Sequence, residues 1–123
     1  MSLTINGLLR ATAADQCATA GSVTPAQIAG NKNDYEPTAQ LLQRWSSDAS
    51  RNVTGMVAGV DAELRIVANV GSFDIVLKNA DSASAAANRF AMTSGADVTL
   101  TAGQMAMAVY DSTTARWRLA KLA

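Results

Sequence analysis

Short segments in which apolar and polar residues alternate, separated by glycine and small polar residues, dominate the chain from Leu41 onward. The segment ELRIVANV is the clearest example, because Leu64 and Ile66 fall on one side of an extended chain and Arg65 and Val67 on the other. A period of two residues is that of a β-strand. Seven or eight such segments, with no long amphipathic helix, predict a mainly β domain: an antiparallel β-sandwich or jelly-roll-like fold, or a small barrel.

The expected core has few large side chains, since the 123 residues include only two tryptophans, two tyrosines and two phenylalanines. In the segment FDIVLK, alternation directs Phe73, Ile75 and Leu77 toward the core. The segments QMAMAVY and ARWRLAKL are expected to form a hairpin around DSTT. Its expected inward residues are Met105, Met107 and Val109 on one strand and Trp117 and Leu119 on the other. The large core side chains are expected to be Trp45, Phe73, Phe90 and Trp117.

The first forty residues differ from the rest in being rich in alanine, threonine, glycine and asparagine, with little sustained periodicity. We therefore expect two parts. Residues 1–40 form an extended N-terminal arm that anchors the protein or contacts other subunits, and residues 41–123 form the β-sandwich domain. Within the arm, Asn6-Gly7 is a two-residue hairpin signal, because both residues tolerate the positive φ of a type I′ turn.

Charge and hydropathy exclude several classes of partner. Ten basic and ten acidic residues cancel, so no field that gathers nucleic acid is expected. No apolar run approaches the ~20 residues of a membrane span. The N-terminus has neither the basic start nor the apolar stretch of a secretory signal, and a single cysteine, Cys17, allows no internal disulfide. These features predict a soluble protein made in a reducing compartment, without nucleic acid or membrane as a partner.

The residues that most often carry enzyme chemistry are scarce. The chain has no histidine, which removes the commonest general base and the commonest transition-metal ligand. Cys17 has no base to activate it. The aspartates lie in turn contexts, where they serve the backbone, and the acidic segment NKNDYE lacks the central glycine and terminal glutamate of a calcium loop. We expect no catalytic, cofactor-binding or metal-ligating residues, and no enzyme.

Four segments occur in an order that is more specific than any one of them. They are NDYEPT (33–38), RWSSDASRNVTGM (44–56), NVGSFDIVLKNADSASAAANRF (69–90) and AVYDSTTARWRLA (108–120). Together they resemble a β-rich module of structural proteins in tailed bacteriophages and prophages. The resemblance covers the chain from Asn33 to its end, with one departure: Tyr35 stands where that module often has tryptophan.

The resemblance implies a non-enzymatic component of the virion surface, made in the cytoplasm of the host bacterium and assembled as a homotrimer or a larger symmetric array. It also implies candidate interface residues in two of the segments: Asn33, Asp34, Tyr35, Pro37, Asn88 and Arg89. The small residues at 82–87 allow close approach of another backbone, and Arg89 is expected to pair with a carboxylate. A plain crossover between sheets is an equal alternative for this loop.

Three functions of different classes remain in view. The first is a capsid decoration, cement or head-fibre protein that binds the major capsid protein on the outside of the capsid. The second is a tail-fibre or baseplate component involved in host attachment. The third is a carbohydrate-binding β-sandwich, which needs exposed aromatic side chains beside carboxylates or amides. None of the three requires a cofactor.

Overall fold

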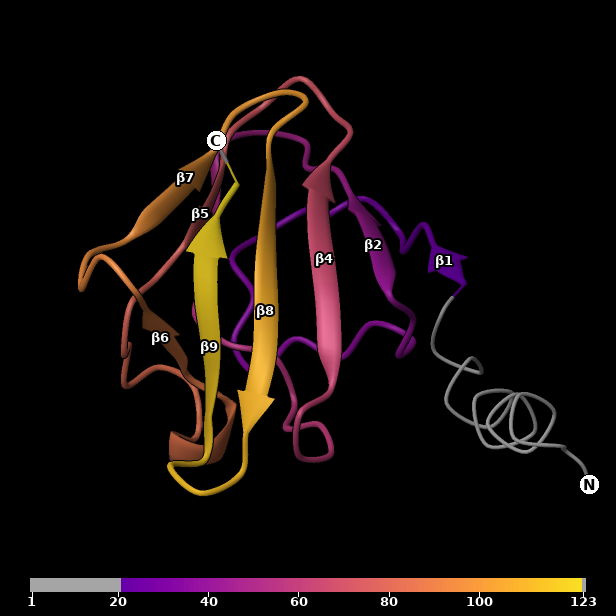
Figure 1. Ribbon diagram of the computed structural model, residues 1–123. Helices are drawn as coiled ribbons and strands as arrows, with labels where there is room; N and C mark the ends of the chain where they lie inside the picture. Colours follow the sequence, from indigo (N-terminus) through magenta and orange to yellow (C-terminus); the bar gives the residue numbers. More distant parts are fainter. Residues whose placement is uncertain (1–20, 123) are drawn as a thin grey trace, which may run out of the picture.

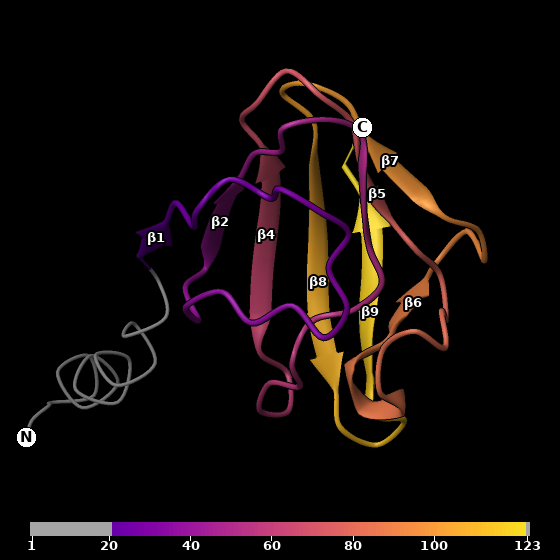
Figure 2. The same cartoon turned by 180° about the vertical axis from the view of Figure 1, so that it is seen from behind.

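The computed structural model describes residues 21–122, which form two β-sheets and one short 3₁₀ turn. Six strands form one sheet in the order β1-β2-β4-β8-β9-β6, and three form a second sheet in the order β3-β5-β7 (Figures 1 and 2). The strands are β1 (Ser22–Val23), β2 (Leu42–Trp45), β3 (Arg51–Val53), β4 (Leu64–Asn69), β5 (Ile75–Leu77), β6 (Phe90–Met92), β7 (Val98–Leu100), β8 (Met105–Asp111) and β9 (Arg116–Lys121). The 3₁₀ turn is η2 (Ala86–Asn88).

The first part of the described chain is a stack of three parallel coils. Ser22 pairs in parallel with Leu42, twenty residues later, and Leu42 pairs in parallel with Ile66, twenty-four residues later. On the other side of the stack β3 pairs in parallel with β5, and further parallel bridges join residues 28, 32 and 35 to residues 47, 53 and 56. We name residues 22–37, 42–57 and 66–79 the first, second and third coils. Such stacking is typical of a solenoid, in which each coil contacts its neighbours.

The last part of the chain adds antiparallel strands to this stack. β8 pairs antiparallel with β4 and with β9, and β7 pairs antiparallel with β5, whereas β6 pairs in parallel with β9. The expected hairpin around DSTT is confirmed as β8 and β9. The mainly β class is therefore confirmed. The sheets are mixed, however, and a purely antiparallel sandwich or jelly roll is not confirmed.

The core lies between the two sheets and contains three of the four large side chains expected there. Trp45, Phe90 and Trp117 are each at most 1% exposed. Phe73 was expected beside them, and this prediction is wrong, because its side chain is 48% exposed. Phe73 lies in the bend between β4 and β5, where its carbonyl accepts a hydrogen bond from the Asn69 side chain at 2.7 Å. The alternation of buried and partly exposed side chains in β5 starts only after this bend.

The expected orientation of β8 is also wrong. Met105 and Met107 point outward and Val109 is only partly covered, whereas Ala106, Ala108 and Tyr110 are buried, as the burial pattern along the strand shows. The register explains the difference. Tyr110 lies opposite Trp117, and the two rings pack edge to face at 5.1 Å. A one-residue change of register would turn every side chain of β8 to the other face.

Residues 21–40, expected to belong to an arm, are part of the folded domain. β1 forms the edge of the six-stranded sheet, and Ile28 is 1% exposed within the core. The Ile28 amide donates to the Ser46 carbonyl, and the Ile28 carbonyl accepts from the Asp48 amide. The rest of the expected arm, residues 1–20 with Asn6-Gly7 and Cys17, lies outside the described residues.

Candidate functional site

Asp34 and Asn88, two of the six expected interface residues, meet although 54 positions separate them in the sequence. The Asn88 side-chain amide donates to Asp34 Oδ1 at 2.8 Å, and the Ala85 amide donates to the same oxygen at 2.7 Å. The Asp34 amide donates in turn to Ser84 Oγ at 2.9 Å. Asp34 adopts a positive φ of 49°, which asparagine and aspartate tolerate better than most residues. The first coil is thereby joined to the loop between β5 and β6.

The second coil joins this cluster through the buried Thr54 hydroxyl. Thr54 Oγ1 lies 2.7 Å from Ser84 Oγ and donates to Asn33 Oδ1, also at 2.7 Å. The Ala58 amide donates to Asn88 Oδ1 at 2.8 Å. Three distant segments therefore share one set of hydrogen bonds, which we name the Asp34 network; its side chains are Asn33, Asp34, Thr54, Ser84 and Asn88.

The other three expected interface residues surround the network. Arg89 donates through Nε to the Ser84 carbonyl at 2.9 Å, so its guanidinium binds a backbone oxygen here and not the carboxylate that was expected. Tyr35 packs edge-on against Trp45 with ring centroids 5.0 Å apart, and burial raises the pKa of the Tyr35 hydroxyl. Pro37 is buried. These contacts lie within one chain, and a role in binding another subunit stays a prediction.

The loop at 82–88, made largely of small residues, is held by hydrogen bonds from several elements. Besides the contacts to Asp34, the Tyr110 hydroxyl donates to the Ala87 carbonyl at 2.9 Å, and Arg116 donates to the Ala86 carbonyl. The small side chains let this backbone lie close to the second coil, where a Cβ added to Gly55 would lie 2.4 Å from the Asn88 carbonyl oxygen. Close packing within the chain thus accounts for the composition of the loop.

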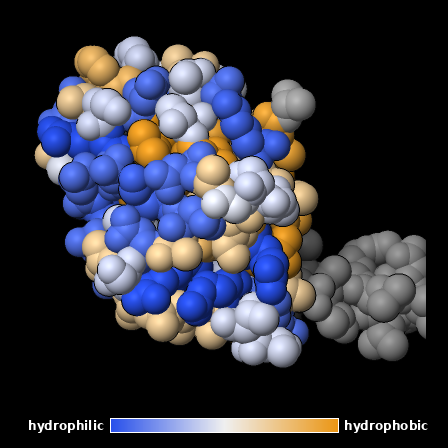
Figure 3. Space-filling view, turned by 90° about the vertical axis from the view of Figure 1, so that its left-hand side faces the viewer, coloured by the Kyte–Doolittle hydropathy of each residue, from blue (hydrophilic) through white to orange (hydrophobic). Residues whose placement is uncertain are grey.

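A second surface, which the sequence analysis did not identify, is the outward side of the six-stranded sheet. Figure 1 looks onto this side, and no other described segment crosses in front of β4 and β8. In Figure 3 the same side is seen in profile, and hydrophobic atoms gather along that edge of the molecule. We name its residues the apolar sheet face: Leu42, Leu64, Ile66, Ala68, Met105, Met107, Val109, Ala120 and Leu122.

Pairing between strands arranges the apolar sheet face in rows, because residues directly opposite each other share a side of the sheet. The central row runs from Leu42 through Ile66 and Met107 to Ala120. A second row contains Ala68 and Met105, and a third contains Leu64 and Val109. Leu64, Met105 and Met107 are 38%, 40% and 39% exposed. Apolar side chains that are contiguous over several strands mark an interaction site more often than isolated ones do.

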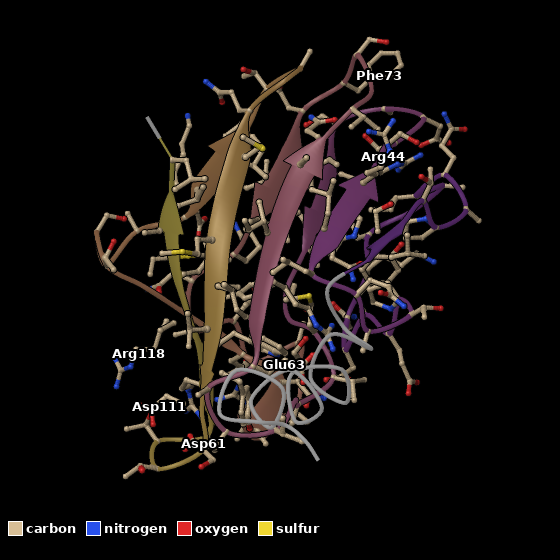
Figure 4. All side chains as sticks on the ribbon, turned by 45° about the vertical axis from the view of Figure 1, so that its right-hand side comes forward. Arg44, Asp61, Glu63, Phe73, Asp111 and Arg118 are labelled. Carbon is tan, nitrogen blue, oxygen red and sulfur yellow. The ribbon has the colours of Figure 1, made fainter. Side chains whose placement is uncertain are left out.

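Charged side chains lie at opposite corners of this face. Arg44 is at the β2 end of one row, and Arg118 is at the β9 end of another, as Figure 4 shows. Arg118 donates to Asp111 Oδ2 at 3.1 Å. Hydrogen bonds from Thr114 and then from Arg118 lower the pKa of Asp111. The centre of the face carries no charged side chain, which is the arrangement of an apolar interface core with a polar rim.

A signal for this face is present in the sequence. The strand MAMAVY is apolar at every position, and in ELRIVANV both alternating sets contain apolar residues. A strand with one side in water normally alternates apolar and polar residues, whereas a strand covered on both sides reads as a continuous apolar run. The run in β8 is therefore of the kind found in strands covered on both sides, whereas its Met105 and Met107 are 40% and 39% exposed in one chain.

A groove of about 610 Å³ opens where the first and second coils end, lined by residues 36–39 and 57–60 with Glu63 and Arg65. Arg65 forms an ion pair with Glu63 at 2.8 Å, and its guanidinium lies 4.8 Å from the centre of the Trp117 ring. These two charges therefore pair with each other at the wall of the groove.

From residue 21 to residue 122 no three His, Cys, Asp or Glu side chains gather as they would around a metal ion. No helix in this part of the chain combines the length and the apolar character needed to cross a bilayer. Comparisons of the chain with protein-family models, with curated proteins and with solved structures find no match.

Proposed function

We propose that the protein is a non-enzymatic structural component of a tailed-phage virion, which decorates or cements the outside of the capsid as a homotrimer. The observation that carries this proposal is the apolar sheet face. Nine apolar side chains lie together on four neighbouring strands and the segment after them, and all but Ala68 are partly open to water in one chain. A surface of this kind is covered when the protein works in an assembly, and a virion is an assembly of many chains.

The contacts between the four motif segments support the same proposal. Asp34 of the first segment binds Asn88 of the third. Thr54 of the second segment contacts Ser84 of the third. Trp117 of the fourth donates from its indole nitrogen to the Met56 carbonyl of the second at 3.1 Å. Residues that carry the resemblance to phage structural modules therefore depend on one another for position, as expected if they specify one architecture together.

Cosedimentation of the purified protein with phage heads and, separately, with tails tests this function. We expect saturable binding to heads, with a number of copies per head that matches the local symmetry axes of the capsid. Binding only to tails would contradict the decoration role and would assign the protein to a tail fibre or baseplate. Binding to neither would contradict a virion role altogether, and a glycan array would then test the carbohydrate-binding alternative.

A further inference from the structure

We propose that the apolar sheet face is the surface through which copies of this chain bind one another, with three faces packed around a common axis. This inference rests on the proposed function, which supplies the homotrimer, and adds the residues that form it. The partner is a second copy, because the width of the apolar sheet face suits a closed ring of three copies and its charged side chains lie only at its margins, as the following steps show.

The width of the face suits three copies. The central row runs across β2, β4, β8 and β9, and four strands about 4.8 Å apart make a strip about 19 Å wide. Three such strips, facing inward as the sides of a triangular prism, each lie about 5.5 Å from the axis. Packed sheets lie about 10 Å apart, so the side chains of each sheet fill about 5 Å. The side chains at the middle of the strip, on β4 and β8, therefore just reach the axis.

The area of the face sets how tightly the copies can associate. Nine apolar positions, each about 4.8 Å by 7 Å, give about 300 Å² of apolar surface per chain. Two copies face to face would bury about 600 Å² in total and three about 900 Å², which is about 300 Å² per chain in either case and the size of a weak contact that dissociates on dilution. A closed ring of identical copies covers every face and leaves none open.

The charges of the chain permit this arrangement. The net charge is zero, so like copies do not repel one another at long range. Arg44 and Arg118 lie at the margins of the face, next to the corners of the prism. Arg118 already has Asp111 as a partner, and Arg44 has the Thr24 hydroxyl at 3.3 Å. No charged side chain enters the central row, where burial without a partner would be costly.

Methionine oxidation in the unmodified protein tests the inference without altering the fold. Met105 and Met107 lie on the face, whereas Met56 and Met92 are 0% and 7% exposed within the core and serve as internal controls. We expect hydrogen peroxide to oxidise Met105 and Met107 slowly at concentrations where sedimentation gives three times the chain mass. Dilution to monomer should make both react at least about tenfold faster, with Met56 and Met92 slow throughout.

A charged substitution in the central row is the second test, and Met107→Glu is suited to it because that side chain already reaches solvent. We expect the variant to remain folded and to associate at least about tenfold more weakly. Val60→Glu is the matched control, because Val60 is 72% exposed and lies outside the face. This substitution should leave the mass of the assembly in sedimentation unchanged. Fast oxidation of Met105 and Met107 in an intact trimer would show that another surface joins the copies and would overturn the inference.

Head binding, measured on the same variants, separates this inference from the proposed function. If Met107→Glu keeps the mass of the wild type but no longer binds heads, the face contacts the capsid and the self-association proposal is wrong, while the decoration role stands. If the wild type is a trimer with protected methionines but binds neither heads nor tails, the proposed function fails and the inference about the face stands. A wild type that is monomeric at every concentration, with both methionines reactive, contradicts the inference.

Discussion

The Asp34 carboxylate accepts a hydrogen bond from the Asn88 side chain at 2.8 Å, and this contact joins the first coil of the domain to the loop that precedes β6. The same oxygen accepts the Ala85 amide. Hydrogen bonds to a charged acceptor are stronger than those between neutral groups. This carboxylate thus acts together with Tyr110 and Arg116 to hold a loop of small residues that has no apolar side chain long enough to anchor itself.

The Asp34 network is expected to make stability depend on pH. The hydrogen bond from Asn88, followed by that from Ala85, lowers the pKa of Asp34 from 3.8. The stabilisation is complete above the unfolded-state pKa and is lost as the pH falls through the lower folded-state pKa. Asp34→Asn should therefore be less stable than the wild type at pH 7, and the difference should shrink toward pH 2.5. Urea unfolding followed by tryptophan fluorescence at both pH values measures it.

Asp48→Asn is the matched control for this prediction. Arg51 lowers the pKa of Asp48 through a side-chain hydrogen bond, but the pair lies at the surface, and exposed ion pairs contribute little to stability. The difference in the free energy of unfolding between Asp48→Asn and the wild type should vary less with pH than the difference for Asp34→Asn. Parallel pH profiles for Asp34→Asn and the wild type would show that the Asp34 carboxylate does not stabilise the fold through its charge.

Gly55 is expected to tolerate no larger residue, for reasons of space and not of backbone conformation. A Cβ at this position would lie 2.4 Å from the Asn88 carbonyl oxygen and 2.7 Å from Ser84 Oγ. Gly55→Ala should lower the free energy of unfolding by about 1–3 kcal/mol, as other overpacked sites do. Gly30→Ala is the control, since nothing lies within 4 Å of its added Cβ. Equal denaturation midpoints for both variants would contradict the close packing of the loop.

The strands themselves were predictable from the sequence, but the direction of their side chains was not. Period-two alternation and turn residues indicate most of the strands, including the hairpin of β8 and β9. In β8, however, both alternating sets are apolar, so the pattern does not say which set is buried. The packing of Tyr110 against Trp117 decides it, and this contact depends on pairing between strands, which no single segment reveals.

The parallel stacking was missed for a related reason. The coils repeat after twenty and twenty-four residues, yet equivalent positions carry different residues: Val23 pairs with Gln43, which pairs with Val67. Without a repeated sequence there is no internal similarity to detect. Four of the expected interface residues, Asn33, Asp34, Asn88 and Arg89, gather in space within one chain, and their role in an interface stays a prediction. The role of those contacts in holding one chain together was not visible from their spacing.

The two phenylalanines are expected to differ sharply in their effect on stability, although both were expected in the core. Phe90 is 0% exposed and pairs with Trp117 across β6 and β9, whereas Phe73 is 48% exposed in a bend. Phe90→Ala should cost about 3–5 kcal/mol, through lost burial and the cavity that remains. Phe73→Ala should change the free energy of unfolding by less than about 1 kcal/mol. Comparable losses in urea unfolding would place Phe73 in the core after all.

Arg65 is expected to be the most costly charged residue to remove, because Glu63 depends on it. The two side chains are only 7% and 10% exposed. Arg65→Ala would leave the Glu63 carboxylate buried without its partner, which costs about 3–5 kcal/mol at comparable sites. Replacing both charges, by Arg65→Met with Glu63→Gln, keeps similar volumes over the Trp117 ring. The new amide side chain also retains an oxygen for the Val60 amide, which donates to Glu63 Oε1 in the wild type. The double variant should therefore be more stable than Arg65→Ala, because no charge is left unpaired. If it is no more stable in urea unfolding, the loss in Arg65→Ala comes from packing against Trp117 and not from an unpaired carboxylate.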